Sequence, residues 1–230
     1  MTSEQLLTIL RLTTVHFIMV VHMNTKDKIW NTALDLFSKS GFEGVSVRDI
    51  ASAVGVRESA LYRHYKNKRE IYDVILVQYH THINAFFAQL SLENSEGEFI
   101  NGQNAVDFFG TVTEQQLIDM GKQIFYFLFC DQISAKVRRM LTIEQYNNKA
   151  AAELYRKISF EDALSYQSGL FQDMINHGLF RQTDPYIMAL HFVAPMFLFF
   201  YKFDDDEQGL ALAQGMIEEH IKQFGRIYAP

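Results

Sequence analysis

The segment between residues 57 and 69 concentrates side chains that bind phosphates and base edges. It holds five Lys or Arg residues against one acidic residue, Glu58. Ammonium and guanidinium groups neutralise phosphates, and guanidinium also donates paired hydrogen bonds to a guanine edge. Tyr62 adds a phenol that suits a phosphate. A solvated charged face is the alternative interpretation of such a run, so the elements that carry it decide between the two.

Two short helical patterns joined by a glycine position this segment. Ser46 and Asp49 have the spacing of a capping box, which marks a helix start. Gly55 supplies the positive φ that ends this helix. Ala60 and Leu61 anchor the next helix and leave its polar residues mainly outward. This is the layout of a helix-turn-helix, so the pattern predicts DNA contact by the polar helix.

Helical patterns also flank the helix-turn-helix, and we find no strand-like alternation. A supporting helix is expected from Asn24 or Thr25 to about Ser40, and a long one over Asn67–Leu92. A helix is expected over about 104–131, either continuous or broken near Gly110 or Gly121. Further helices are expected over about 134–157, 160–177, 185–203 and 207–227. The fold class is therefore predicted as all-α, with an N-terminal three-helix DNA-binding domain and a C-terminal helical domain for ligand binding and dimerisation.

Charge divides along the chain in the same way. Residues 24–70 carry nine Lys or Arg against six Asp or Glu, for a net charge of +3. Residues 71–230 carry eleven basic against twenty acidic residues, for a net charge of −9. The whole chain has a net charge of −6, which by itself is unusual for a DNA-binding protein. An acidic body with one basic head explains it, so we place a boundary near residue 70.

Residues 25–76 resemble the TetR family of bacterial transcriptional regulators. The matching positions are Ala33, Phe37, Gly41-Phe42, Ser46–Ala51, Ala53, Gly55-Val56, Leu61-Tyr62, His64-Tyr65, Lys68 and Ile71. They combine helix starts, the turn glycine and the Leu-Tyr spacing, and they cover under a quarter of the chain. The resemblance implies a homodimer that binds a palindromic double-stranded DNA operator, usually as a repressor released by a small-molecule effector.

The resemblance also implies roles for single residues. Tyr62 and Lys68 would hold phosphates, Ser46 and Arg48 would lie at the backbone or groove edge, and the third helix would enter the major groove. The expected DNA-binding residues are Ser46, Arg48, Arg57, Glu58, Ser59, Tyr62, Arg63, His64 and Lys68. Arg57 departs from the family, which often has Ser or Thr there as a helix cap. It therefore weakens the cap and places a possible guanine reader at this position.

The C-terminal part is rich in Phe and Met, which favours an apolar or aromatic ligand pocket between helices, although an ordinary core is the simpler interpretation. Its candidate lining residues are Phe125, Tyr126, Phe129, Phe171, Met174, His191, Phe192 and Met196. Apolar stripes on the last two helices suit either packing within the chain or a four-helix bundle between two chains. The candidate dimer residues are Ile187, Leu190, Leu210, Ala213, Ile217, His220 and Phe224.

Other features argue against catalysis and metal binding. Cys130 is a single cysteine inside an apolar run, so we expect a buried thiol in a reducing cytoplasm. His80 and His82 diverge on a helix, and residues 204–207 are expected to be a solvated acidic turn. No motif of a known catalytic or cofactor site is present, so we expect no enzyme activity, no cofactor and no metal.

Residues 1–22 contain apolar runs that are too short to span a bilayer, so we expect no stable membrane insertion. An extra packing helix, a membrane-surface segment and an upstream extension before a start at Met23 all remain open, and we favour the extension. For the whole chain, the leading hypothesis is a ligand-responsive repressor. The alternatives are an activator, a helical small-molecule-binding or enzymatic protein with a vestigial head, and a membrane-surface regulator.

Overall fold

The computed structural model of the chain describes residues 24–230, except residues 94, 95, 97 and 205. The expectation for residues 1–23 lies outside this range. The described residues form helices and one isolated β-bridge, between Glu93 and Phe99, and contain no strand, which confirms the all-α prediction. They divide into two compact units, with the boundary after Gln78.

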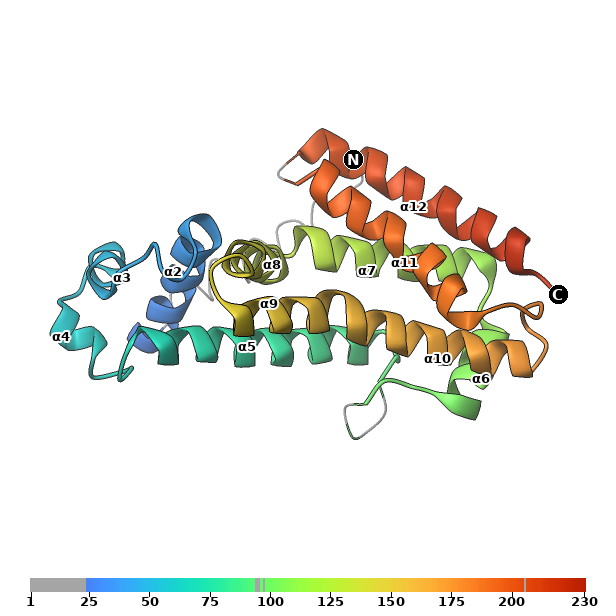
Figure 1. The fold of residues 1–230 in the computed structure, drawn as a ribbon, viewed down its shortest axis with the longest axis horizontal. Helices are drawn as coiled ribbons and strands as arrows, with labels where there is room; N and C mark the ends of the chain where they lie inside the picture. Colours follow the sequence, from blue (N-terminus) through green and yellow to red (C-terminus); the bar gives the residue numbers. More distant parts are fainter. Residues whose placement is uncertain (1–23, 94–95, 97, 205) are drawn as a thin grey trace, which may run out of the picture. The chain divides into compact units, whose positions relative to one another are not determined.

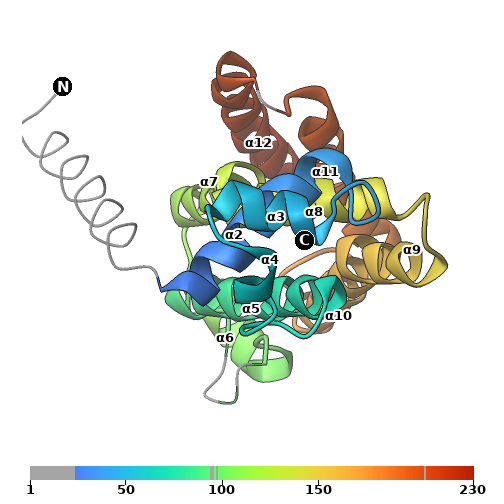
Figure 2. The same cartoon turned by 90° about the vertical axis from the view of Figure 1, so that its left-hand side faces the viewer.

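The N-terminal unit contains the three predicted short helices and the start of a longer one (Figure 1). These are α2 (Thr25–Ser40), α3 (Val47–Val54), α4 (Glu58–Leu61) and the first turns of α5 (Lys68–Gln89). Figure 2 shows α3 and α4 as separate short helices in front of α2. Helix α2 begins where expected, because the Asn24 side chain accepts a hydrogen bond from the Asp27 backbone N–H at 2.9 Å.

The boundary between the units lies inside α5, beyond the position near residue 70 that the charge pattern predicts. The first turns of α5 belong to the N-terminal unit because their apolar side chains complete its core. Ile71 and Tyr72 are buried, and the Tyr72 ring meets the Phe42 ring edge-on at 5.3 Å. The change in net charge near residue 70 and the end of the N-terminal compact unit after Gln78 thus fall at different positions along the chain.

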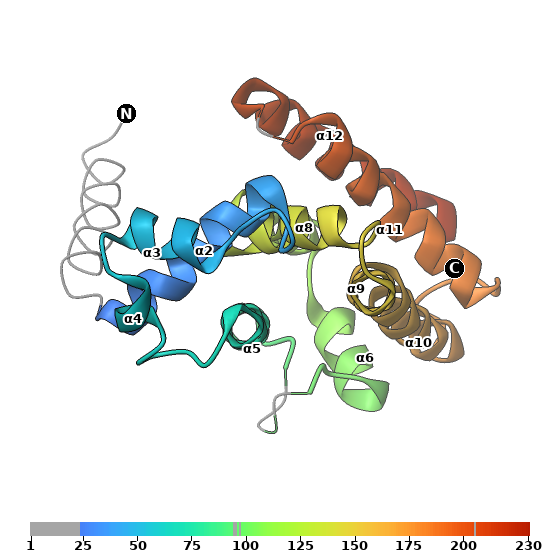
Figure 3. The same cartoon turned by 60° about the vertical axis from the view of Figure 1, so that its left-hand side comes forward.

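The C-terminal unit is a set of helices that pack in antiparallel and crossing pairs. They are α6 (Gly102–Thr111), α7 (Glu114–Cys130), α8 (Gln132–Glu144), α9 (Lys149–Arg156), the π-helical turn η1 (Lys157–Glu161), α10 (Asp162–Asn176), α11 (Pro185–Lys202) and α12 (Glu207–Tyr228). Figures 1 and 3 show α11 and α12 side by side, and α9 continuing through η1 into α10.

Two predicted helices are each divided in the structure, and side-chain caps explain both breaks. Thr113 starts α7 with a capping box to Gln116, so the break falls after Gly110 and well before Gly121. The Asn148 side chain accepts hydrogen bonds from two backbone N–H groups at the start of α9. The helical periodicity of the sequence is defined by apolar residues, so it does not show that Thr113 and Asn148 start new helices.

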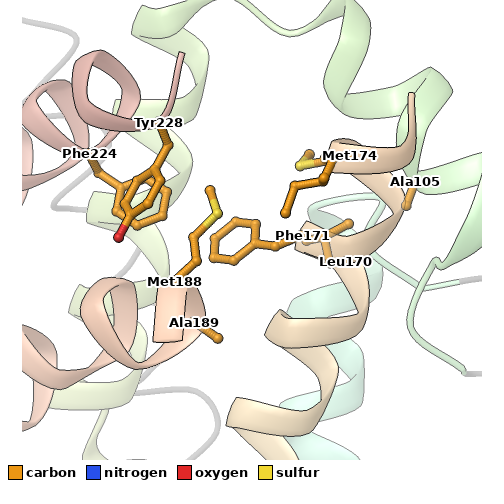
Figure 4. Packing of buried hydrophobic residues seen from close by; sticks show 9 residues of the cluster. Ala105, Leu170, Phe171, Met174, Met188, Ala189, Phe224 and Tyr228 are labelled. Carbon is orange, nitrogen blue, oxygen red and sulfur yellow. The ribbon is translucent and has the colours of Figure 1, made fainter. Parts of the chain in front are cut away.

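Two apolar clusters form the core of this unit. The first joins α6, α10, α11 and α12 (Figure 4), and its buried residues are Ala105, Leu170, Phe171, Met174, Ile175, Met188, Ala189, Phe224 and Tyr228. The second joins α7, α11 and α12, and its buried residues are Phe125, Phe129, Met196, Phe199, Phe200, Phe203, Ala213 and Ile217. Phe192 is half-buried and packs against both clusters, so α11 connects them.

Helix α11 is apolar well beyond the side that faces these clusters. Within the described residues it is the one helix that is long and apolar enough to cross a membrane by length and composition alone. Core helices of soluble proteins pass the same test, but only 22% of this stretch is buried. The described residues thus leave its outward apolar side chains uncovered.

We expect Phe125→Ala to destabilise the chain and Tyr126→Ala to leave its stability nearly unchanged. Phe125 is 0% exposed and stacks on the Phe200 ring at 5.7 Å, whereas Tyr126 is 52% exposed. Removing a buried Phe ring costs about 3–5 kcal/mol of unfolding free energy, and an exposed substitution costs under about 1 kcal/mol. Urea denaturation followed by far-UV circular dichroism measures both, and similar midpoints for the two variants would contradict the core assignment.

Candidate nucleic-acid interface

The turn between α3 and α4 is fixed by backbone hydrogen bonds that the sequence pattern anticipates. Gly55 has φ 80° and ψ 31°, the left-handed conformation that glycine adopts without strain. The Gly55 N–H donates to the Ser52 carbonyl at 3.1 Å, and the Val56 N–H donates to the Ala51 carbonyl at 2.9 Å. This pair of bonds is a Schellman motif, which ends α3 and directs the chain into α4.

At the other end of α3, the predicted capping box is confirmed. The Asp49 backbone N–H donates to the Ser46 hydroxyl at 3.1 Å, and the Asp49 carboxylate accepts from the Ser46 hydroxyl and N–H at 2.6 and 2.8 Å. These two hydrogen bonds hold the pKa of the Asp49 carboxyl below its ordinary value. The Ser46 hydroxyl proton is thus used inside the chain, so its first role is to start α3.

Helix α4 is shorter than the polar helix that the sequence predicts. Arg57 stands at its N-cap without a side-chain hydrogen bond, as expected for a residue that cannot cap a helix. Regular helix ends at Leu61, and the Leu61 carbonyl then accepts from the N–H groups of His64 and Tyr65 at 2.9 and 3.1 Å. The residues from Tyr62 to His64 therefore continue as a turn.

Two buried side chains orient this turn. Leu61 and Tyr65 are 0% and 1% exposed, and they lie four residues apart, so both point to the core side. The Tyr65 hydroxyl donates to the Lys26 carbonyl at 3.1 Å, and burial raises the pKa of Tyr65 to about 12. Tyr65 is thus a packing residue, as predicted, and residues 62–64 between the two anchors face outward.

All but one of the predicted DNA-binding residues are exposed. The exposed ones are Ser46, Arg48, Arg57, Glu58, Ser59, Tyr62, Arg63 and His64. No ion pair to another described residue involves Arg48, Arg57 or Arg63. Exposed guanidinium groups that form no ion pair with the described residues are suited to phosphates and base edges. The N-terminal unit therefore presents these groups together on the helix-turn-helix.

Lys68 is the exception, because its ammonium group is turned toward the protein. It donates to the Phe42 carbonyl at 2.6 Å and to the Val45 carbonyl at 2.9 Å, and it lies 4.1 Å from the centre of the Phe42 ring. These contacts attach the first turn of α5 to the connection between α2 and α3. Two of its three N–H donors are used in this way, so a phosphate contact competes with an internal role.

The predicted ligand-binding residues divide between core and surface. Phe125, Phe129 and Met196 belong to one apolar cluster, and Phe171 and Met174 belong to the other. Phe192 packs between the two, as described above. These six side chains are therefore brought near one another by α7, α10 and α11, within a packed interior.

The two polar residues among the predicted ligand-binding residues, Tyr126 and His191, are exposed. Tyr126 is 52% exposed on α7, because the buried Phe125 and Phe127 on either side of it hold it outward. His191 is exposed on α11, where its Nδ1 lies 3.1 Å from the Tyr228 hydroxyl. Buried and exposed residues alternate along each helix, and this alternation places Tyr126 and His191 at the surface. A run of aromatic residues in the sequence does not show which of them are buried.

The predicted dimer residues on α12 are directed into their own chain. Leu210 and His220 are half-buried, and Ala213, Ile217 and Phe224 are 0%, 0% and 4% exposed. The His220 Nε2 donates to the Phe192 carbonyl at 2.9 Å, and burial lowers the pKa of His220. Packing within the chain, the alternative considered above, therefore accounts for the apolar stripe of α12.

The predicted dimer residues on α11, in contrast, face outward. Ile187 and Leu190 are 55% and 43% exposed. Three further exposed residues extend the same line at helical spacing. We call this set the outer face of α11, and it consists of Ile187, Leu190, Ala194, Leu198 and Tyr201. Sequence reasoning missed its last three members. From Leu190 onward, successive members are four, four and three residues apart, and this helical spacing is visible in the sequence.

Comparison with known proteins identifies the N-terminal unit. Residues 29–75 match the family model of bacterial regulatory proteins of the tetR family. The negative transcriptional regulator IcaR of Staphylococcus epidermidis is 47% identical over 47 residues, which make up 20% of this chain and 25% of IcaR. The chain thus matches only about a quarter of the length of this curated relative.

Solved structures extend the likeness to the fold of most of the chain. A tetR-family regulator from Mesorhizobium loti has a TM-score of 0.61 and 18% identity, over 90% of this chain and 97% of that one. SmeT in complex with triclosan, a repressor from Stenotrophomonas maltophilia, has a TM-score of 0.60 and 19% identity, over 90% and 93%. At this identity the likeness establishes the fold alone.

We expect Lys68→Met to lower the stability of the N-terminal unit and to leave the salt dependence of DNA binding unchanged. The substitution keeps the side-chain length but removes the two hydrogen bonds to carbonyl oxygens, at a cost of about 1–3 kcal/mol. Thermal unfolding measures the first effect, and DNA affinity at several salt concentrations measures the second.

Lys66→Met is the matched control, because Lys66 is exposed and its ammonium forms no hydrogen bond or ion pair with the described residues. If Lys66 contacts a phosphate, its loss flattens the salt slope by about one unit without changing stability. A flatter slope with unchanged stability for Lys68→Met would instead make Lys68 a phosphate ligand.

Proposed function

We propose that this chain is a DNA-binding transcriptional regulator of the tetR family, because residues 29–75 match the model of that family. It acts as a repressor that binds a palindromic operator as a homodimer. We further propose that a small apolar or aromatic ligand releases it. The exposed guanidinium groups of Arg48, Arg57 and Arg63, none of them neutralised by another described residue, are the main support for the DNA-binding role.

In the N-terminal unit, we assign affinity for DNA and specificity for its sequence to different residues. Tyr62 and Arg48 are placed to hold phosphates, which fixes the position of the head on the duplex. Arg57 and Arg63 flank the short helix α4, so they are the candidates for contacts with base edges in the major groove. Arg57 gains this role by giving up helix capping, since a guanidinium cannot accept the hydrogen bond that a cap requires.

Two proteins that this chain resembles are repressors, which supports repression as its function. IcaR is described as a negative transcriptional regulator of a biofilm operon, and SmeT as the repressor of a multidrug efflux pump. The likeness to IcaR covers 47 residues, and the likeness to SmeT is one of fold. Repression and a cytoplasmic location therefore remain proposals for this chain. Activation through the same fold is the second candidate. The position of the operator relative to the promoter distinguishes repression from activation.

The outer face of α11 supports the homodimer. It is a line of apolar side chains with Leu198 and Tyr201 61% and 59% exposed. The adjacent α12 adds Leu212, which is 53% exposed, and Gly215, which has open space where a side chain would lie. A second copy that presents the same surface would bury both helices in a four-helix bundle, as expected for an isologous interface. We therefore propose a second copy, rather than a membrane, as the cover of α11.

Release by a ligand requires that the C-terminal unit influence the heads. Helix α5 runs through the boundary after Gln78, so it belongs to both units. A ligand that binds one arrangement of α5 more tightly than another would change the separation of the two heads. The structure of SmeT with triclosan shows that one protein of this fold binds an aromatic molecule, which supports the proposed ligand class.

Selection of bound sequences from random DNA tests the operator proposal. We expect enrichment of a palindrome whose half-sites lie about one helical turn apart. Arg57→Ala and Arg63→Ala should each cost about 1–3 kcal/mol of operator binding and relax the preference at one base position. Arg156→Ala, an exposed change in α9, is the control and should have no effect. Equal losses on operator and random DNA would show that neither arginine reads bases.

We expect Leu198→Glu to convert the dimer into a monomer, because a carboxylate in an apolar interface loses its hydration without gaining a partner. Sedimentation equilibrium at micromolar concentration measures the mass. Operator affinity should fall by about a hundredfold or more, since one head then binds without its tethered partner. Tyr146→Glu, at an 83% exposed position outside α11, is the control. A Leu198→Glu variant that stays dimeric would place the interface elsewhere.

A further inference from the structure

A hollow on the C-terminal unit lies beside the first apolar cluster, since Leu164 lines the hollow and packs against that cluster. Its volume is about 400 Å³, and it lies between the start of α10, the π-helical turn η1 and the first turn of α11. The residues that line it are Phe160, Glu161, Leu164, Ser165, Ser168 and Tyr186. None of them is among the residues that sequence analysis assigned to a ligand. The hollow is therefore a second place where this unit can bind a small molecule.

The π-helical turn shapes one wall of the hollow. A π-turn inserts one residue into a helix, and such turns are frequent at functional sites. Phe160 lies in this turn, and its ring is held by the Phe197 ring at 4.8 Å and, edge-on, by the Tyr155 ring at 5.7 Å. Tyr186, on α11, is 52% exposed, so a second aromatic side chain is open to solvent at this site. A fixed and an accessible aromatic ring thus line one hollow.

The hollow also carries one negative charge without a counterion among the described residues. Glu161 is exposed and forms no ion pair with any described residue. The nearest cation along the chain, Lys157, is engaged with Asp162 at 2.5 Å. The hydroxyl groups of Ser165 and Ser168 make no side-chain hydrogen bond within the described part of the chain. One carboxylate, two aromatic rings and two hydroxyls are thus left for a ligand.

This combination selects for a particular chemistry. Aromatic faces attract organic cations, and the attraction increases when a carboxylate lies beside them. An anion would be repelled by Glu161, and a neutral aromatic molecule would use the rings but not the charge. We propose that this hollow binds small organic monocations with an aromatic group, with Glu161 as the counterion and Phe160 and Tyr186 as the aromatic contacts.

Calorimetric titration of the full chain in the absence of DNA tests the binding site. Benzyltrimethylammonium is the probe, and neopentylbenzene, in which carbon replaces the nitrogen, is its neutral counterpart. Benzylsulfonate supplies the aromatic anion. We expect one cation bound per chain, with the neutral and the anionic compounds bound more weakly. Affinity for the cation should also fall as salt is added, because Glu161 is exposed to solvent.

Two substitutions assign the site. Glu161→Gln should weaken cation binding by about threefold to fivefold, as expected for a partly solvated ion pair, and should leave the neutral compound unaffected. Glu153→Gln removes the same charge from an exposed position on α9 that does not line the hollow, so it is the control. Tyr186→Ala should weaken the binding of both the cation and the neutral compound. Unchanged affinity in Glu161→Gln, equal binding of the three probes, or no binding would overturn the proposal.

Binding of the cation does not depend on the repressor proposal, and the two fail separately. Glu161 lies outside the N-terminal unit, so Glu161→Gln should keep its affinity for DNA. Loss of DNA binding in the wild-type chain would reject the proposed function and leave the cation site intact. A chain that binds its operator but no cation would reject this site alone.

Discussion

Burial of Leu61 and Tyr65 on one side of a single turn is the constraint on which the DNA-facing surface depends. The two side chains are almost wholly enclosed, and four residues separate them, so the three residues between them have no place in the core. Helix α4 is too short to orient those residues by regular helix geometry. The Schellman motif at Gly55 and the capping box at Ser46 set the direction of approach. These local hydrogen bonds and the buried side chains of Leu61 and Tyr65 together direct the polar residues 62–64 toward solvent, although α4 itself has only four residues.

The same unit continues into α5, and Lys68 shows how closely the two are connected. Its ammonium binds two carbonyl oxygens beside the Phe42 ring, so the start of α5 cannot shift without breaking charge-assisted hydrogen bonds. Helix α5 then passes through the boundary between the units without interruption. Any signal from the C-terminal unit that travels along α5 would therefore act on a helix that is attached at its first turn. Such coupling needs a ligand that distinguishes two arrangements of α5.

The C-terminal unit has apolar surface that the described residues do not enclose. Helix α11 contributes Met188 and Met196 to the two clusters, yet its opposite side presents Leu190 and Leu198 to solvent. A helix that is apolar all round is stable in water only when both sides are covered. This is the physical reason for assigning the outer face of α11 to a second copy. The hollow at η1 differs in kind, since its aromatic side chains lie beside a carboxylate.

The sequence by itself determined the local features of this protein. Capping residues, the turn glycine and apolar spacing predicted α2, α3 and the all-α class, because hydrogen bonds within a few residues govern them. Only the tertiary structure decided which side of each helix is buried. It placed Tyr126 at the surface, turned the stripe of α12 inward, engaged Lys68 with carbonyls and brought Tyr186 beside Phe160. These positions depend on contacts between residues far apart in the chain, and periodicity shows that a face is apolar without showing which partner covers it.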